Sequence, residues 1–330
     1  MTTRLVFFFG EKGFIIVRYY MKKIGIVTVN YNTAEDTKNL LQSLKHAKAP
    51  DFTLDIIIVD NGSKDIFKLP ESLNQKNIQI IRSETNTGFS GGNNIGIKEA
   101  LKRDVDYILI INNDTIVDSE MIVNLLKVLE SKPEIGVTTP KIYFAKGREY
   151  HKDRYKKEDL GKVFWFAGGS TDWNNVMSVH RGIDEVDHGQ YDTIEETTFA
   201  TGCCMMFKRE VLEKVGLFDD RYFLYYEDAD LNERVRRAGY EIYYVPTAVL
   251  VHVNAASTGG AGNVLHDYFI SRNKMLFGMA YAPLRTKIAL IRESLRLLRN
   301  GRPFQKLAIK DYYTRRFNKG TFFENKEKIK

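Results

Sequence analysis

The chain has 330 residues, 43% of them hydrophobic, which is enough for one large domain with an appendage. Its net charge is +7, and residues 281–330 alone carry 14 Lys or Arg against 4 Asp or Glu, a local net of +10. The basic character therefore belongs to the tail, so we expect no nucleic-acid groove in the main domain and no nucleic-acid partner. No apolar run reaches the length of a membrane-spanning helix.

Residues 1–20 mix a short apolar patch with charges and have no small-residue cleavage site, so they are not typical of a secretory signal. The first clear strand pattern opens just after Met21. We therefore expect residues 1–20 to be a disordered extension or a mis-annotated start, with a functional arm as the alternative.

From Lys23 the chain alternates strand and helix patterns. Continuous apolar, β-branched runs predict four strands, over residues 24–29, 54–60, 78–82 and 107–114. Helices are predicted to begin near Thr33, near Gly92 and after Asp118. Strand–helix units in this succession predict an α/β fold with a mostly parallel, doubly wound sheet and helices on both faces.

The second half of the chain is less regular. Residues 140–200 keep no helical period, and we expect a mixed region with strands and a long loop. Two helices should follow, one ended by Gly216 and one running from about Glu227 to Gly239, before a basic helical tail. This divides the chain into a main domain over 21–270, with halves 21–138 and 139–270, and an appendage over 271–330.

Four polar clusters follow the predicted strands, and ligands of such sheets bind beyond the carboxyl ends of the strands. The clusters are Asn30–Asn32, Asp60–Ser63, Asn86–Asn94 and Asn112–Asp114. Their members supply our candidates for ligand binding, namely Asn30, Tyr31, Asp60, Gly88, Asn94 and Asn113. The Gly-rich cluster lacks the GxGxxG and GK[ST] patterns, which argues against dinucleotide binding and ATP hydrolysis.

Two strand-end acids are the main candidates for ligand and metal binding. Asp60 can accept hydrogen bonds from a base or ribose, and the alternative is a turn-forming Asp-Asn-Gly. Asp114 suits a hard divalent cation that takes its other oxygens from a diphosphate. An N-cap role for Asp114 is the alternative, although Asp118 already competes for that position.

Acids also open the predicted helix at 227. Glu227, Asp228 and Asp230 fit the positive end of a helix dipole without any catalytic role. They follow a run of aromatic and aliphatic residues, however, and a partly desolvated carboxylate is a better general base. His252 interrupts an apolar strand and is either a core residue or, if its strand reaches the edge that carries Asp114, a ligand of metal or diphosphate.

Taken together, these residues resemble glycosyltransferase family 2 enzymes of the GT-A fold, and most closely their bacterial rhamnosyltransferase-like members. The resemblance runs from about Lys23 to Lys274. It rests on motifs in a fixed order, VNYN, VDNGS, NTGFSGGNN, INND, TGCCMMFKRE, GLFDD with FLYYEDADL, YVP and the later His252. It implies a Rossmann-like, mostly parallel central sheet flanked by helices, followed here by the basic helical appendage.

The resemblance also implies a reaction, in which a sugar moves with inversion from a dTDP- or UDP-linked donor to a hydroxyl of a glycan or lipid-linked acceptor. Rhamnose is one candidate sugar, and bacterial cell-surface polysaccharide or lipid-linked glycan synthesis is the implied setting. The alternative is a non-catalytic sugar-binding or scaffold protein, which would have no need of the acids and His252 together.

Carried over residue by residue, the resemblance assigns the six strand-end candidates to a nucleotide sugar, with Tyr31 and Asp60 at its base and ribose. It makes Asp228 the general base, with Glu227 turned towards the acceptor. Asp114 becomes the acid of a DxD-type motif, and His252 completes a site for Mg²⁺ or Mn²⁺. The first acid of that motif is Asn112 here, which implies weaker metal binding.

Trp165 and Gly202 are our candidates for contact with the acceptor, with a structural role as the alternative for the tryptophan. The adjacent Cys203 and Cys204 fit neither a disulfide framework nor a zinc site, as expected of a reduced, cytoplasmic protein.

The tail has the pattern of an amphipathic helix. One stripe of the helix is apolar and consists of Leu284, Ile288, Ile291, Leu295 and Leu298. Another stripe is basic and consists of Arg285, Arg292, Arg296 and Arg299. Such a helix can lie on an anionic membrane surface, here the inner face of the cell membrane. The alternative is a helix packed against the catalytic domain with solvated arginines.

Overall fold

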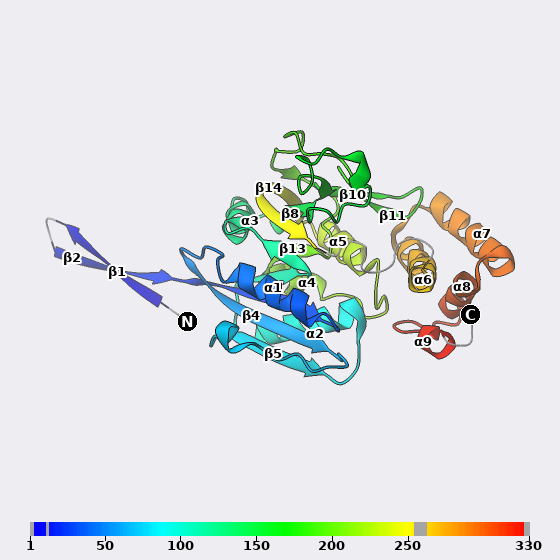
Figure 1. Ribbon diagram of the computed structural model, residues 1–330, viewed down its shortest axis with the longest axis horizontal. Coiled ribbons are helices and arrows are strands. Elements are labelled where there is room, and N and C mark those ends of the chain that lie inside the picture. The colour runs from blue at the N-terminus through cyan, green and yellow to red at the C-terminus, as the bar shows by residue number, and fades with distance from the viewer. Residues whose placement is uncertain (1–2, 11–12, 254–262, 327–330) are drawn as a thin grey trace.

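The computed structural model describes residues 3–10, 13–253 and 263–326, and its centre is a mixed sheet (Figure 1). The sheet order is β12-β14-β8-β13-β6-β3-β4-β5, with β7 paired to β14 and β9 to β8. The strands are β3 (Lys22–Asn30), β4 (Phe52–Asn61), β5 (Ile78–Ser83), β6 (Tyr107–Ile111), β7 (Thr115–Val117), β8 (Ile135–Phe144), β9 (Phe164–Phe166), β12 (Glu195–Glu196), β13 (Cys204–Lys208) and β14 (Glu241–His252).

The predicted parallel core is confirmed. β3 pairs in parallel with both β4 and β6, and β4 with β5. β13 runs antiparallel between β6 and β8, after which β14 again pairs in parallel with β8. A mostly parallel sheet of this kind must be covered on both faces, which explains the uninterrupted apolar strands of the sequence.

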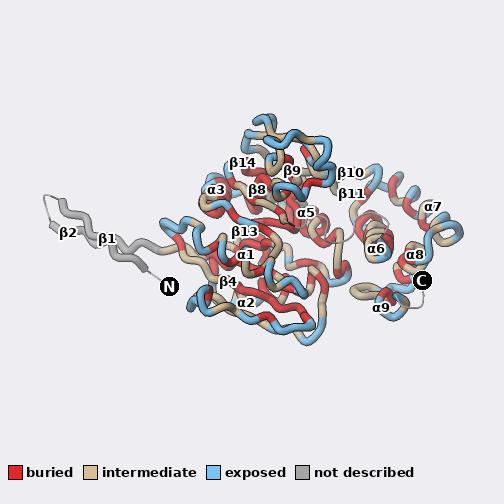
Figure 2. The backbone as a smooth tube through the Cα atoms, in the orientation of Figure 1, coloured by how far each residue is buried: buried red, intermediate tan, exposed pale blue. Residues whose placement is uncertain are grey.

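Helices cover the two faces of the sheet. α1 (Ala34–Leu44) and α3 (Met121–Leu129) pack on the side to which Ile26 points, and α2 (Gly88–Lys102), α4 (Arg209–Val215) and α5 (Glu227–Arg237) pack on the side of Val27. Neighbouring strand residues point to opposite faces, and both of these are fully buried. Figure 2 shows this buried layer in red along the strands.

Two local predictions need correction, namely the start of α2 and the end of the fourth strand. α2 begins at Gly88, not near Gly92, because Gly92 and Gly96 let the helix approach β3 and β4 closely; a Cβ on Gly96 would lie 2.3 Å from Val27. The link from β4 to β5, for which no helix was predicted, carries a 3-10 turn (Glu71–Leu73). The fourth strand ends at Ile111, and β7 follows the polar turn.

The irregular middle of the chain contains short strands, as expected. β10 (Gly169–Asp172) and β11 (Met177–His180) form a separate antiparallel pair beside the C-terminal helices (Figure 1). Residues 3–10 and 13–20, for which we expected no regular structure, form a second antiparallel pair, β1 (Thr3–Gly10) and β2 (Gly13–Tyr20), which projects from the body.

The C-terminal region is helical, as predicted. It consists of α6 (Val264–Tyr281), α7 (Leu284–Asn300), α8 (Pro303–Tyr313) and α9 (Phe322–Asn325). The domain boundary proposed at 270/271 falls inside α6, and Phe269 of this helix stacks on Phe223, which precedes α5. The helical region is therefore joined to the catalytic core by packing. Across the described parts of the chain, no helix has both the length and the apolar character needed to cross a bilayer.

Candidate active site

The topology brings the polar clusters to one edge of the sheet. The parallel strands β3, β4 and β6 all end there, and the antiparallel β13 begins there, with Cys204 opposite Ile111. β14 ends at the same edge, where His252 lies opposite Thr115 of β7. Residues far apart in sequence thus share a single rim, as the strand-end rule predicts.

Asp60 lies at the centre of the first corner of this rim and is fully buried. Its carboxylate accepts hydrogen bonds from the Asn30 amide, the Phe67 backbone N–H and the Arg82 guanidinium. Burial raises the pKa of Asp60, but these donors and Ser63 outweigh it and hold the pKa below its ordinary value. Asp60 is therefore ionised, and its hydrogen bonds hold the surrounding turns in place. Its contact with a nucleoside remains a prediction.

The Gly-rich loop is fixed by Asn61, next to Asp60. The side chain of Asn61 accepts from the backbone N–H and hydroxyl of Thr87 and donates to the carbonyl of Gly88. Gly88 has a φ of +78°, and a Cβ there would lie 2.3 Å from the carbonyl oxygen of Phe223. Only glycine fits this close approach without strain.

The remaining nucleotide-site candidates differ in accessibility. Tyr31 is 45% exposed at the rim. Asn113 donates to the hydroxyls of Thr33 and Thr37, which fixes the turn after β6. Asn94 is buried, and its amide is taken up by Phe218 and Asp220. Asn94 therefore joins α2 to the loop before α5, and any part in nucleotide binding remains a prediction.

Asp114 and His252 meet at the second corner. The Oδ1 of Asp114 lies 3.3 Å from the Nε2 of His252, and both side chains are largely buried. The Trp165 ring packs edge-on against His252, with ring centroids 4.6 Å apart, so Trp165 lies beside this pair. The interpretation of His252 as a residue at the Asp114 edge, and not only a core histidine, agrees with this geometry.

This pair suits a divalent cation. A carboxylate oxygen and an imidazole nitrogen so close together offer two donors of the kinds that Mn²⁺ accepts, and Mg²⁺ commonly completes its shell with water and substrate phosphates. Among the described residues no cluster of three or more His, Cys, Asp or Glu side chains could hold a metal alone. Beyond Asp114 and His252, an ion here can take ligands from water and substrate phosphates.

Asp228 lies at the third corner, at the start of α5. Its carboxylate accepts from the backbone N–H of Gly202 at 3.0 Å and from that of Ala229 at 2.8 Å. Burial raises the pKa of Asp228, and these backbone donors offset the increase only in part. Gly202, expected at the acceptor, here orients the carboxylate.

The two neighbouring acids behave differently from Asp228. Glu227 is buried, and its Oε2 has no hydrogen-bond partner among the described residues. Burial, followed by the charge of Asp228, raises the pKa of Glu227 well above its ordinary value. Asp230 is bound by Arg234, Tyr281 and Tyr222, so it ties α5 to its surroundings.

The segment before α5 has an unusual backbone. Phe223, Tyr225 and Tyr226 have φ values of +66°, +69° and +71°, a region that bulky residues rarely adopt. It is bonded to α6 through Arg272 and Asn273, both fully buried.

Sequence reasoning missed Arg272 and Asn273. The only signal was an Arg–Asn pair between the apolar residues of the predicted helix, since buried charged groups need partners. Those partners lie about fifty residues away in the chain, beyond the reach of local patterns.

Comparison with known proteins identifies the family of the chain. The family described as Glycosyl transferase family 2 matches residues 25–216, more than half of the chain. The chain belongs to glycosyltransferase family 2. It is therefore an enzyme that transfers sugar, which favours catalysis over the scaffold alternative.

Individual relatives of this glycosyltransferase are distant. A hexosyltransferase of low-salt glycan biosynthesis, Agl10 of Haloferax volcanii, is 24% identical over 77% of this chain and 74% of its own length. The N-acetylglucosaminyl-diphospho-decaprenol L-rhamnosyltransferase of Mycobacterium tuberculosis is 26% identical over 71% of this chain and 77% of its own length.

A solved structure with the same fold is that of GalNAc-T7 with UDP, GalNAc and Mn²⁺. It superposes with a TM-score of 0.55 at 14% identity, covering 89% of this chain and 58% of that one. This likeness confirms the GT-A fold. The mycobacterial relative confirms the resemblance to rhamnosyltransferase-like members of the family.

Proposed function

We propose that this glycosyltransferase transfers a sugar with inversion from a nucleoside-diphosphate donor to an acceptor hydroxyl. The observation that supports this most directly is the fixed carboxylate of Asp228 on the same rim as the Asp114–His252 pair. A base and a diphosphate site on one rim can act on opposite sides of a single anomeric carbon, as direct displacement requires.

Asp228 is the proposed general base. The acceptor hydroxyl gives its proton to this carboxylate while its oxygen attacks the anomeric carbon opposite the diphosphate. The new glycosidic bond forms as the bond to the diphosphate breaks, and the configuration inverts. The raised pKa of Asp228 makes it a stronger base than an exposed aspartate, and the N–H groups of Gly202 and Ala229 keep it aimed.

Asp114 and His252 are the proposed holders of Mg²⁺ or Mn²⁺, and the Mn²⁺ named with GalNAc-T7 supports this choice. When bound, such an ion supplies positive charge to the leaving diphosphate. Trp165 keeps the imidazole of His252 in place by edge-on packing. Near Asp60, the exposed Tyr31 is the side chain best placed to meet a nucleoside, with Asn30, Gly88, Asn94 and Asn113 shaping the surrounding turns.

The acceptor is proposed to be a glycan carried on a lipid diphosphate, since the mycobacterial relative is named for such an acceptor. Rhamnose from a dTDP- or UDP-linked donor is the first sugar to test, for the same reason. We propose accordingly that the enzyme works in the cytoplasm, on the inner face of the cell membrane, in cell-surface polysaccharide synthesis.

A donor screen tests this function. Purified enzyme is incubated with dTDP-, UDP- and GDP-sugars, a lipid-linked acceptor and Mn²⁺, and the released nucleoside diphosphate is measured. We expect one donor class to be preferred and the anomeric configuration of the product, read by NMR, to be opposite to that of the donor. Retained configuration would contradict the single displacement.

A further inference from the structure

α7 turns two different faces to its surroundings. Thr286, Leu290 and Ser294 are buried against the neighbouring helices. Four residues of the apolar stripe lie elsewhere on the helix and face solvent, with Leu284 75%, Ile288 45%, Ile291 41% and Leu295 58% exposed, whereas the fifth, Leu298, is half-buried against the core. These four residues recur at helical spacing, so they form one continuous apolar strip that the described part of the chain leaves exposed.

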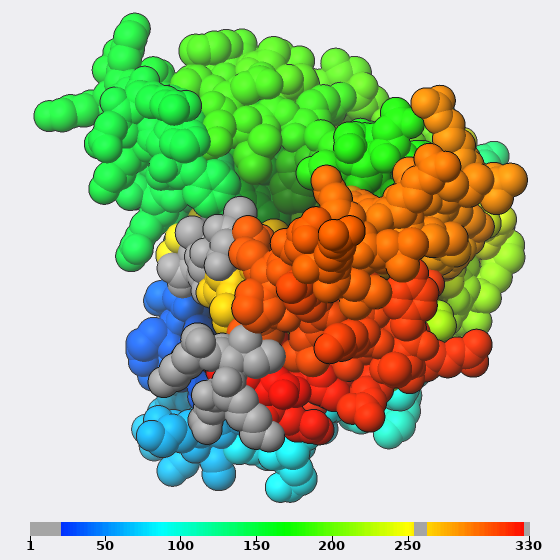
Figure 3. Space-filling view, turned by 90° about the vertical axis from the view of Figure 1, so that its right-hand side faces the viewer, coloured from blue at the N-terminus to red at the C-terminus, as the bar shows by residue number. Residues whose placement is uncertain are grey.

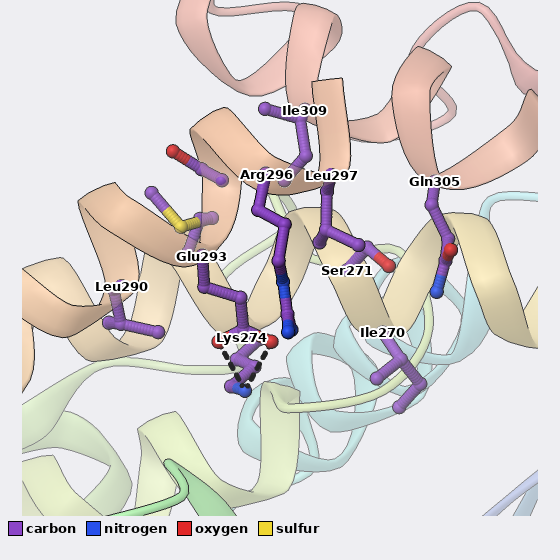
Figure 4. Close-up of a pocket in the computed structure, with 11 residues that line it drawn as sticks. Ile270, Ser271, Lys274, Leu290, Glu293, Arg296, Leu297, Gln305 and Ile309 are labelled. Atoms are coloured by element: carbon purple, nitrogen blue, oxygen red, sulfur yellow. Dashed lines mark hydrogen bonds and ion pairs between the residues drawn. The ribbon is translucent and has the colours of Figure 1, made fainter. Parts of the chain in front are cut away.

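The inner face alone fastens α7 to the protein. Lys274 of α6 is paired with Glu293 at 2.8 Å (Figure 4). The Ser294 hydroxyl lies 2.7 Å from that of Tyr313 on α8. Leu290 packs against Gly278, where a Cβ would lie 2.3 Å away. The inner face therefore holds the helix in place, and the exposed apolar strip is left free for another contact.

The arginines of α7 are exposed beside the strip. Arg285, Arg292, Arg296 and Arg299 are in no ion pair with another described residue. Glu293 is the only acid in the helix, and Lys274 already neutralises it. Figure 3 shows α7, in orange, at the surface of the molecule among the other C-terminal helices.

We propose that this outward face of α7 docks on an anionic lipid bilayer. The apolar strip would enter the interface while the arginines meet lipid phosphates, the arrangement of helices that lie in the plane of a membrane. A second copy of the chain is the poorer occupant, since a two-fold contact would bring the same unpaired arginines together. The inference rests on the proposed lipid-linked acceptor, because that substrate resides at such a surface.

Vesicle co-sedimentation of the full chain tests the docking. The vesicles are phosphatidylcholine with or without phosphatidylglycerol, each at low and high salt. We expect binding only to the anionic vesicles at low salt. Each basic residue near such a surface strengthens binding about fivefold, so Arg292→Gln with Arg296→Gln should weaken it roughly twenty-five-fold. Lys156→Gln with Lys157→Gln, which removes equal charge from another exposed site, should bind like the wild type.

A second pair of variants probes the apolar strip. Ile288→Ser with Leu295→Ser should also reduce vesicle binding without lowering the melting temperature, since both side chains are exposed. Unchanged binding in either α7 variant, or equal binding to neutral vesicles, would overturn the proposal. Self-association detected by sedimentation in place of vesicle binding would assign the strip to a second copy and equally overturn it.

Transfer to a water-soluble acceptor separates this inference from the proposed function. Both α7 variants should keep the wild-type rate on a soluble acceptor and lose rate only on a lipid-linked acceptor in vesicles. An enzyme that binds vesicles but transfers no sugar to either acceptor would leave the docking intact and contradict the function instead.

Discussion

The side-chain amide nitrogen of Asn273 lies 2.8 Å from the carbonyl oxygen of Tyr225, inside the segment that leads to the proposed base. The same nitrogen is within hydrogen-bond distance of the carbonyls of Tyr222 and Leu224. A left-handed backbone costs about 1–2 kcal/mol per residue, and Tyr225 is one of three such residues here. The amide of a C-terminal helix thus holds in place the strained turn from which Asp228 projects.

We therefore expect Asn273→Ala to lower kcat at least tenfold while the donor Kd stays within about twofold, since the misplaced group would be the base. The melting temperature should also fall, because an unsatisfied buried polar group costs about 1–3 kcal/mol. Ser271→Ala, buried on the same helix, is the matched control. If the folded Asn273→Ala enzyme keeps the wild-type kcat, the contact between Asn273 and the turn has only a structural role.

Asp228→Asn should keep the fold and donor binding but lower turnover by about two to four orders of magnitude, the usual contribution of a general base. Asp230→Asn is an informative comparison, because Asp230 is held by Arg234 and Tyr281. The Asp230→Asn variant should have a lower melting temperature, and its turnover should fall much less than that of Asp228→Asn. Comparable turnover in the Asp228→Asn and wild-type enzymes would remove Asp228 as the base.

The pH–rate profile should report the raised pKa of Asp228. The base acts only when ionised, so kcat should fall as the pH drops through a value above 3.8, the ordinary pKa of an aspartate. Rates are measured with a soluble acceptor at saturating donor. An acid limb centred at or below 3.8 would contradict a buried base.

Glu227 should make stability depend on pH. A carboxyl whose pKa is raised by folding stabilises the protein while it is protonated, below its unfolded pKa, and this contribution is lost as the pH rises through the folded pKa. Glu227→Gln should therefore melt at a higher temperature than the wild type at pH 8, with the difference disappearing below about pH 4. Thermal melts across this range provide the measurement, and an equal difference at all pH values would exclude titration as the cause.

Removal of metal should abolish transfer, and Mn²⁺ or Mg²⁺ should restore it. Asp114→Ala should eliminate metal-dependent donor binding, and His252→Ala should weaken it about tenfold or more. Asp118→Ala is the control, because the Asp118 carboxylate accepts a hydrogen bond from the backbone N–H of Glu120 and is not part of the Asp114–His252 pair. Isothermal titration with donor, with and without metal, distinguishes these cases. Full activity in excess chelator would exclude the ion.

Much of the catalytic half could be predicted because its signals are local. The strands that end at Asn30 and near Asp60 are continuous apolar runs, and the strand-end rule then selects the rim. The start of α2 was predicted too late because glycines such as Gly88 and Gly92 have poor helix propensity. Close packing of the helix overrides that preference. The exposure of the α7 strip could not be foreseen, since hydrophobic periodicity does not reveal which side of a helix finds a partner.

The contact between Gly88 and Phe223 also has a thermodynamic consequence. The Phe89 N–H donates to the Phe223 carbonyl at 2.7 Å, so the loop after β5 and the turn before Asp228 are a single mechanical unit. A donor sugar that shifts this unit between two conformations changes the affinity for the acceptor by some factor. Because such coupling is reciprocal, the acceptor must change the affinity for the donor by the same factor. Any cooperativity between the two substrates would then depend on a glycine whose missing side chain allows the two segments to touch.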